Sequence, residues 1–119
     1  MPPRRIEPIL AEIIEALDGI GAAANGETAD DFETDWLLRR GVERGIEIFS
    51  EAARHTPDEL LEAAPEIPWK QIRGIGNVLR HEYHKTSDAI VWAVVTENLP
   101  PLRQAIQRIS EAAVARKLI

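Results

Sequence analysis

The stretch RRIEPILAEIIEALDGI, residues 4–20, shows the pattern that decides the fold. Its large apolar side chains recur at intervals of three and four residues, at Ile6, Ile9, Leu10, Ile13, Leu17 and Ile20. This spacing predicts an amphipathic helix with one face against a core. We expect Gly19 and Gly21 to favour the end of that helix, and the segment ANGETADDF (24–32) to form an exposed loop.

A second helix is expected to begin between Asp30 and Thr34 and to run to about His55. Its predicted apolar face consists of Leu38, Val42, Ile46, Phe49, Ala52 and Ala53. Gly41 and Gly45 lie four residues apart on one side of this helix, where each glycine costs ~1 kcal/mol relative to alanine. Small residues at this spacing usually let another backbone approach closely.

The rest of the chain continues the helical pattern. Thr56 is predicted to cap a short helix at 57–63, and a third main helix should run from Trp69 to Tyr83 or His84. A fourth helix follows a cap at Thr86 or Ser87, with a largely buried set of Ala89, Ile90, Trp92, Ala93 and Val94. Pro100 and Pro101 should separate it from a last amphipathic helix that buries Leu102, Ile106 and Ile109.

No segment shows convincing strand alternation, so these helices predict an all-α protein. The short connections favour an antiparallel bundle of four to five helices. The length of 119 residues fits one domain, residues 1–119, with its core at about 4–110. Trp36, Trp69 and Trp92 are most simply core or helix-packing residues.

Composition narrows the class of protein. The chain is 45% hydrophobic and 29% charged, which is an ordinary globular balance, and it has no cysteine. Disulfides and thiolate metal sites are therefore excluded, and a reducing compartment is expected. The start MPPRRIEPIL shows no signal peptide, and no apolar run approaches the ~20 residues that cross a bilayer. We expect a soluble, cytoplasmic protein without a membrane partner.

The charge is unevenly distributed. The net charge of −6 argues against a general polyanion-binding surface. Segment 69–85 nevertheless has four basic residues, Lys70, Arg73, Arg80 and Lys85, against the single acid Glu82. This local +3 on an acidic body favours a local anion site.

Polar side chains share one face of the third main helix. Arg73, Asn77, His81, and then His84 or Lys85, recur every three or four residues. Such a face can bind a phosphate, and histidine can transfer protons near neutral pH. From spacing alone, a simple solvated helix face is the plainer interpretation. His81 and His84 have a spacing that suits a metal, but no neighbouring acids complete a ligand shell, so we expect neither metal nor cofactor. From the sequence alone, Tyr83 can also be interpreted as a tyrosine of the core or its rim, with a hydrogen-bonded hydroxyl.

The run EIPWKQIRGIGNVLRHEYHKTSDAIVWAVVTENLPPLRQAI (66–106) carries a family resemblance. Its elements P-W, G-x-x-N-x-L-x-H-x-Y and V-T-E-N-L-P, with the upstream segment GIEIFSEAARHTPDEL, are similar to the HepT branch of the HEPN domains. The likeness covers roughly residues 4–110. These domains are small helical toxins encoded beside MntA-type minimal nucleotidyltransferase antitoxins.

The resemblance implies a homodimer with a composite cleft and metal-independent RNA cleavage. By this likeness His81 is the catalytic histidine, Asn77 the polar motif residue, and Tyr83 the tyrosine that the antitoxin AMPylates to silence the toxin. His84 and Lys85 would be accessory phosphate-binding residues.

One motif position departs from the family pattern. The pattern R-x4-H-x-Y puts an arginine at position 76, where this chain has Gly76. Arg73 or Arg80 would have to supply the missing charge. The sequence therefore leaves open a dimeric RNA endonuclease, a catalytically weakened module that binds and is modified by its nucleotidyltransferase, and a helical scaffold with neither activity.

Overall fold

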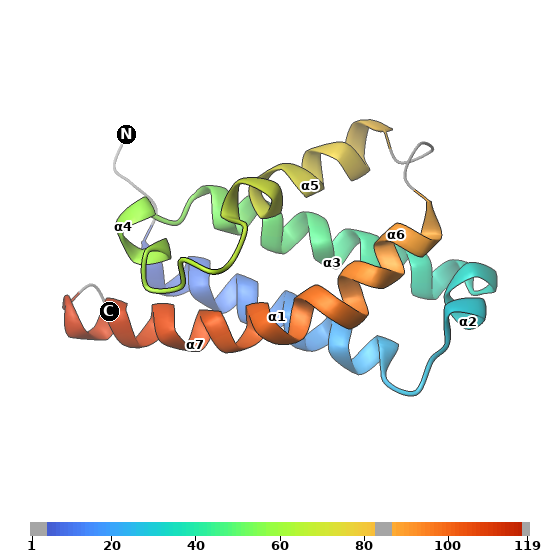
Figure 1. The fold of residues 1–119 in the computed structure, drawn as a ribbon, viewed down its shortest axis with the longest axis horizontal. Helices are drawn as coiled ribbons and strands as arrows, with labels where there is room; N and C mark the ends of the chain where they lie inside the picture. The colour runs from blue at the N-terminus through green and yellow to red at the C-terminus, as the bar shows by residue number, and fades with distance from the viewer. Residues whose placement is uncertain (1–4, 83–86, 118–119) are drawn as a thin grey trace.

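The computed structural model describes residues 5–82 and 87–117, with only the main chain of Glu82. Every regular element in this part of the chain is helical (Figure 1). In order, the elements are α1 (Ile6–Ala24), α2 (Ala29–Thr34), α3 (Trp36–Arg54), α4 (Asp58–Leu61), α5 (Trp69–Glu82), α6 (Asp88–Ala93), the π-helical turn η2 (Val94–Asn98) and α7 (Leu99–Ala115). The predicted all-α class is confirmed.

The long helices run alternately in opposite directions (Figure 1). α1 packs against α3 and α7, and α5 lies along the other side of α3. The apolar stripes predicted for the first two helices form the centre of this core, with Ile9, Ile13, Val42, Ile46 and Phe49 all almost fully buried. The motif helix α5 is therefore held on the bundle chiefly by its packing on α3.

The glycines of the first predicted helix do not end it. α1 continues through Gly19 and Gly21 to Ala24, and the chain turns at Gly26, whose φ is 77°. The expected loop at 24–32 instead contains the start of the short helix α2. Thr28 and Asp31 cap α2 reciprocally, since the Thr28 hydroxyl accepts from the Asp31 N–H and the Asp31 carboxylate accepts from the Thr28 N–H.

Several predictions about individual residues were wrong. Thr56 does not cap α4: its side chain is buried and donates to the Ala52 carbonyl at 3.0 Å, which closes the end of α3. Trp36 is 61% exposed and Ile90 58% exposed, so neither belongs to the core. Trp92 does pack as expected, with its ring centroid 5.2 Å from that of Phe32.

The two prolines do not separate the last helices. α6, capped by the Ser87 hydroxyl as predicted, passes through η2 directly into α7. Proline lacks an N–H and its ring clashes with the carbonyl four residues earlier, so an ordinary α-helix would kink there. The wider π turn, which ends at Asn98 just before Leu99 and Pro100, gives the chain room to continue as one uninterrupted helix (Figure 1).

Candidate active site

The outer face of α5 presents two of the predicted site residues together. Asn77 and His81 are both exposed and lie one helical turn apart. Ile72 and Leu79 are buried on the opposite side of the same helix. The structure therefore confirms that Asn77 and His81 share one face of α5, as their spacing predicted.

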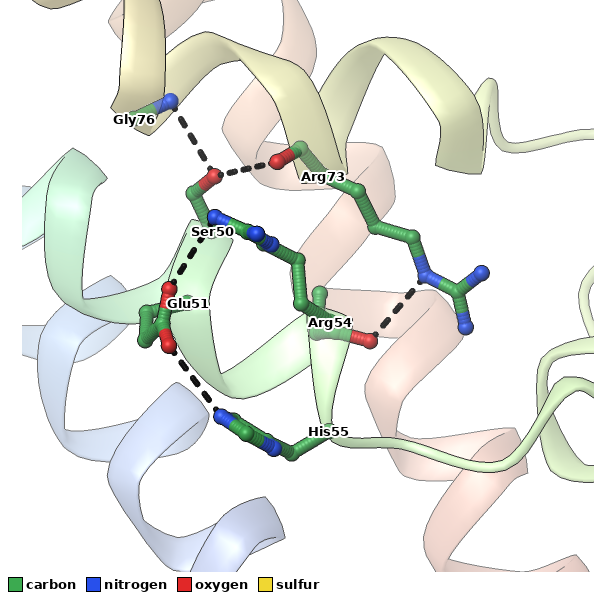
Figure 2. A network of polar contacts seen from close by, with 7 residues as sticks. Ser50, Glu51, Arg54, His55, Arg73 and Gly76 are labelled. Carbon is green, nitrogen blue, oxygen red and sulfur yellow. Dashed lines mark hydrogen bonds and ion pairs between the residues drawn. The ribbon is translucent and has the colours of Figure 1, made fainter.

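Gly76 does not lie on that outer face. It is buried against α3, and a Cβ added there would lie 2.8 Å from Ser50 Oγ, 2.9 Å from Ser50 Cβ and 3.3 Å from Glu47 Cα. The Ser50 hydroxyl accepts from the Gly76 N–H at 3.1 Å (Figure 2). The position at which the family pattern expects an arginine is thus a helix-packing position in this chain.

Arg73 is held by main-chain and carboxylate oxygens in the last turn of α3 and just beyond it. Its Nε donates to the Ala53 carbonyl at 3.2 Å and its Nη2 donates to the Thr56 carbonyl at 2.9 Å. Nη2 also lies 2.8 Å from Asp58 Oδ1. Figure 2 shows the Arg73 side chain extending away from the contact between Ser50 and Gly76. The structure therefore does not bring the Arg73 guanidinium together with Asn77 and His81.

Arg80 is exposed and lies next to His81 in the chain. It lines two hollows. One is a groove of about 860 Å³ between α1 and α3, and the other is a smaller hollow of about 280 Å³ between α3 and the end of α5. Around the large groove the charged residues are Glu12, Glu15, Glu47, Glu51, Arg44 and Arg80. Four carboxylates against two guanidiniums make this groove a poor site for an RNA backbone.

The smaller hollow contains a half-buried carboxylate. Glu43 Oε1 lies 3.1 Å from Arg40 Nη1, and the Glu43 side chain is only 14% exposed. Burial raises the pKa of Glu43 above 4.5, an effect that the nearby Arg40 guanidinium partly opposes and that the Asp88 carboxylate reinforces. Neither Asn77 nor His81 lines either hollow.

Three predicted residues, Tyr83, His84 and Lys85, lie outside the residues that the structure describes. Within residues 5–82 and 87–117, no group of three or more His, Asp or Glu side chains could hold a metal ion. The third histidine, His55, lies at the end of α3 with its Nε2 3.1 Å from Glu51 Oε1 (Figure 2).

Sequence reasoning missed Ser50 altogether. It is 1% exposed, accepts from the Gly76 N–H, and donates to the Arg73 carbonyl at 3.2 Å. The available signal was a hydroxyl on the apolar stripe of α3, one turn beyond Ile46 and one turn before Ala53. A polar residue in such a stripe needs a partner, and here the partner is the main chain of α5.

The known proteins that this chain resembles all have names that describe a ribonuclease. A family model described as HepT-like, Ribonuclease HepT-like, matches residues 13–109. A protein of Caldanaerobacter subterraneus subsp. tengcongensis named "Putative RNase TTE0752" is 30% identical over 102 residues, which cover 86% of this chain and 91% of the relative. In Methanocaldococcus jannaschii, "Putative RNase MJ1380" is 26% identical over 107 residues, 90% of this chain and 98% of the relative.

"Probable ribonuclease HepT" of Thermococcus cleftensis is 28% identical over 100 residues, 84% of this chain and 91% of the relative. No solved structure matches the chain. In the part of the chain that the structure describes, no helix combines the length and the apolar character that a membrane span requires.

Proposed function

Because this chain belongs to the HepT-like ribonuclease family, we propose that it is an RNA endonuclease whose active residues lie on the outer face of α5. One observation carries the proposal. Asn77 and His81 are exposed together, one turn apart, with Arg80 adjacent. An imidazole, an amide and a guanidinium on one helix can bind a phosphodiester and move the protons of its cleavage.

The proposed reaction is attack of a ribose 2′-hydroxyl on the neighbouring phosphorus, without a metal ion. A new P–O2′ bond forms, the P–O5′ bond breaks, and a 2′,3′-cyclic phosphate remains on one product. The proton of the 2′-hydroxyl is lost to a base, and the departing 5′-oxygen takes up a proton. His81 has the chemistry for either transfer, and a guanidinium would stabilise the charge on the phosphorane.

Arg80 is the better candidate than Arg73 for that guanidinium. The Arg73 side chain is already engaged by two carbonyls and a carboxylate. Arg80 is exposed on the last described turn of α5 and adjoins His81 in the chain, and its side chain lines the two hollows beside the face of Asn77 and His81. We therefore assign phosphate binding to Arg80 and, for Arg73, a role in holding α5 on the bundle.

A homodimer would complete the site. One subunit offers a single motif histidine on an open helix face that lines neither of the two hollows, whereas acid and base steps are best served by two groups. A two-fold axis beside α5 would bring two copies of His81 to one cleft. Light scattering at micromolar concentration should give the dimer mass, and a monomer alone would contradict a composite site.

The decisive experiment compares three purified proteins on mixed RNA. Wild type should cleave, His81→Ala should lose activity by ~10²–10⁴-fold, and His55→Ala should retain it. His55 is the matched control because its imidazole is exposed at the end of α3, on a different helix from His81, and pairs with Glu51. Equal cleavage by all three proteins, or none by wild type, would contradict the proposed activity.

We further propose that the chain is the toxin of a toxin–antitoxin pair and that an MntA-type minimal nucleotidyltransferase attaches AMP to Tyr83. The added phosphate would bring negative charge and bulk two residues from His81, which opposes RNA binding. Intact mass after co-expression with the transferase should increase by AMP in wild type and not in Tyr83→Phe. An unchanged wild-type mass would contradict the modification.

The second candidate function is a weakened module that binds its transferase without cleaving RNA. The observation that favours it is Gly76, since the motif arginine is absent and its position is filled by packing. Loss of one electrostatic stabiliser typically costs ~10²–10³ in rate. AMP addition and complex formation without RNA cleavage by the unmodified protein would select this alternative.

A further inference from the structure

Ser50 joins the motif helix to the bundle at the turn that precedes Asn77. Among the residues that the structure describes, it is one of two buried polar residues, the other being Thr56. The Ser50 hydroxyl accepts from the Gly76 N–H at 3.1 Å and donates to the Arg73 carbonyl at 3.2 Å (Figure 2). One side chain of α3 thus contacts both ends of a single turn of α5.

The same turn shows why residue 76 is glycine. Any Cβ at that position would meet Ser50 Cβ at 2.9 Å and Ser50 Oγ at 2.8 Å. The hydroxyl could rotate away, but Ser50 Cβ is fixed to the α3 backbone, so a larger residue would force the two helices apart. Ser50 and Gly76 are complementary in shape as well as in hydrogen bonding.

We propose that Ser50 and Gly76 form a matched pair that fixes the rotation of α5 on α3, with Ser50 as a positioning residue for Asn77 and His81. This inference rests on the proposed function for its catalytic consequence. α5 is held chiefly by α3, and successive residues of a helix are 100° apart. A small rotation at Gly76 would therefore swing Asn77 and His81 out of the arrangement that faces the substrate.

The pair can be tested by substituting Ser50 and Gly76 separately and together. Gly76→Ala adds the clashing Cβ, and Gly74→Ala is its control on the same helix, because nothing lies within 4 Å of a Cβ at Gly74. Ser50→Ala removes only the hydroxyl and should not rescue Gly76→Ala, since Ser50 Cβ remains. Ser50→Gly removes both atoms and should rescue it, leaving only the 3.3 Å approach to Glu47 Cα.

The first readout is independent of activity. Amide chemical shifts and hydrogen exchange should change along α5 from Gly76 to His81 in Ser50→Ala, and these changes should be absent in Gly74→Ala. The free energies of unfolding should be strongly non-additive for Ser50→Gly with Gly76→Ala and near additive for Ser50→Ala with Gly76→Ala. Changes confined to Ser50, Arg73 and Gly76, or equal rescue by both serine variants, would overturn the pair as a positioning device.

The second readout is cleavage kinetics. Ser50→Ala should lower kcat by ~10–100-fold while KM changes by less than ~3-fold, because the binding charges remain but the reacting groups are misplaced. Ile109→Val on α7, a conservative core variant away from α5, is the stability control and should keep its kcat. An unchanged kcat in Ser50→Ala would overturn the positioning role. An inactive wild type would contradict the proposed function. The chemical shifts would then decide whether Ser50 and Gly76 fix the rotation of α5 on α3.

Discussion

The Arg73 guanidinium lies 2.8 Å from the Asp58 carboxylate, but this ion pair contributes less to holding Arg73 than its two hydrogen bonds to main-chain carbonyls. The Asp58 side chain is 83% exposed, and ion pairs in water contribute only ~0–1 kcal/mol. The hydrogen bonds from Arg73 to the carbonyls of Ala53 and Thr56 are part-buried. Arg73 therefore anchors α5 mainly through the main chain at the end of α3.

Replacing Arg73 and Asp58 in turn by alanine should separate the contribution of the main-chain hydrogen bonds from that of the ion pair. We expect Arg73→Ala to lower the free energy of unfolding by ~1.5–3 kcal/mol, as for hydrogen bonds from a charged donor, and Asp58→Ala to lower it by less than ~1 kcal/mol. Urea unfolding measures both. Arg73→Lys should recover only part of the loss, because an ammonium group does not reproduce the fork geometry. A larger loss in Asp58→Ala than in Arg73→Ala would show that the ion pair dominates.

The two glycines of α3 should respond in opposite directions to alanine. A Cβ at Gly41 meets nothing within 4 Å, so Gly41→Ala should stabilise the protein by ~0.5–1 kcal/mol through helix propensity. A Cβ at Gly45 would lie 2.6 Å from Ile20 Cγ1 and 2.7 Å from Ile20 Cδ1. Ile20 is buried, so the overpacking cost of ~1–3 kcal/mol should outweigh the propensity gain.

Thermal unfolding of the two variants tests this difference. Adding Ile20→Val, which removes Cδ1, should recover part of the loss in Gly45→Ala and give no such recovery in Gly41→Ala. A stabilised Gly45→Ala would mean that α1 moves away from α3 at little cost.

Glu43 should make stability depend on pH in the acid range. Burial raises the pKa of Glu43 in the folded state above the unfolded value of 4.5, so the folded state binds the proton more tightly. The contribution of Glu43 to stability is therefore least favourable above its raised pKa, and it improves as pH falls through that pKa to about 4.5. Glu43→Gln should gain stability relative to wild type at pH 7 and lose that advantage at pH 4.

Urea midpoints from pH 4 to pH 7 measure this effect. Arg40→Met is the informative comparison, since removing the guanidinium removes the attraction that partly lowers the pKa of Glu43. Its stability deficit should therefore be larger at pH 7 than at pH 4. Parallel curves for wild type and Glu43→Gln across this range would contradict the proposed linkage.

The sequence predicted the helix faces well because burial follows a repeating pattern. Ile13, Ile46 and Ile106 were placed correctly from spacing alone. Helix ends were predicted less well. Glycine inside a helix costs only ~1 kcal/mol, which the burial of Ile20 between Gly19 and Gly21 readily outweighs. Similarly, the π turn before Pro100 let a helix continue where proline usually interrupts one.

Part of the candidate site was predictable in the same way. The spacing of Asn77 and His81 was enough to place both on one exposed face. The role of Arg73 was not predictable, because its partners include main-chain carbonyls that no sequence letter marks. Nor could the helical pattern show that Gly76 faces Ser50, since contacts between helices depend on how their faces meet rather than on either pattern alone.

The packing at Gly76 leads to a last prediction, that restoring the motif arginine will not improve the enzyme. Gly76→Arg recreates the R-x4-H spacing but places Cβ against Ser50 and Glu47, so we expect a loss of ~1–3 kcal/mol in the free energy of unfolding. RNA cleavage per mole of folded protein should not exceed that of wild type. Gly74→Arg, which adds the same charge where a Cβ meets nothing within 4 Å, is the matched control and should be at least as stable as wild type.

The two halves of this prediction can fail separately. A stable Gly76→Arg protein would mean that α5 can rotate away from Ser50 at little cost, which contradicts the matched pair. Faster cleavage by that protein would mean that residue 76 faces the substrate in the active molecule. If instead Arg80→Ala abolishes cleavage while Gly76→Arg is unstable and no faster, the guanidinium function has moved from position 76 to position 80, and Gly76 serves the contact between α3 and α5.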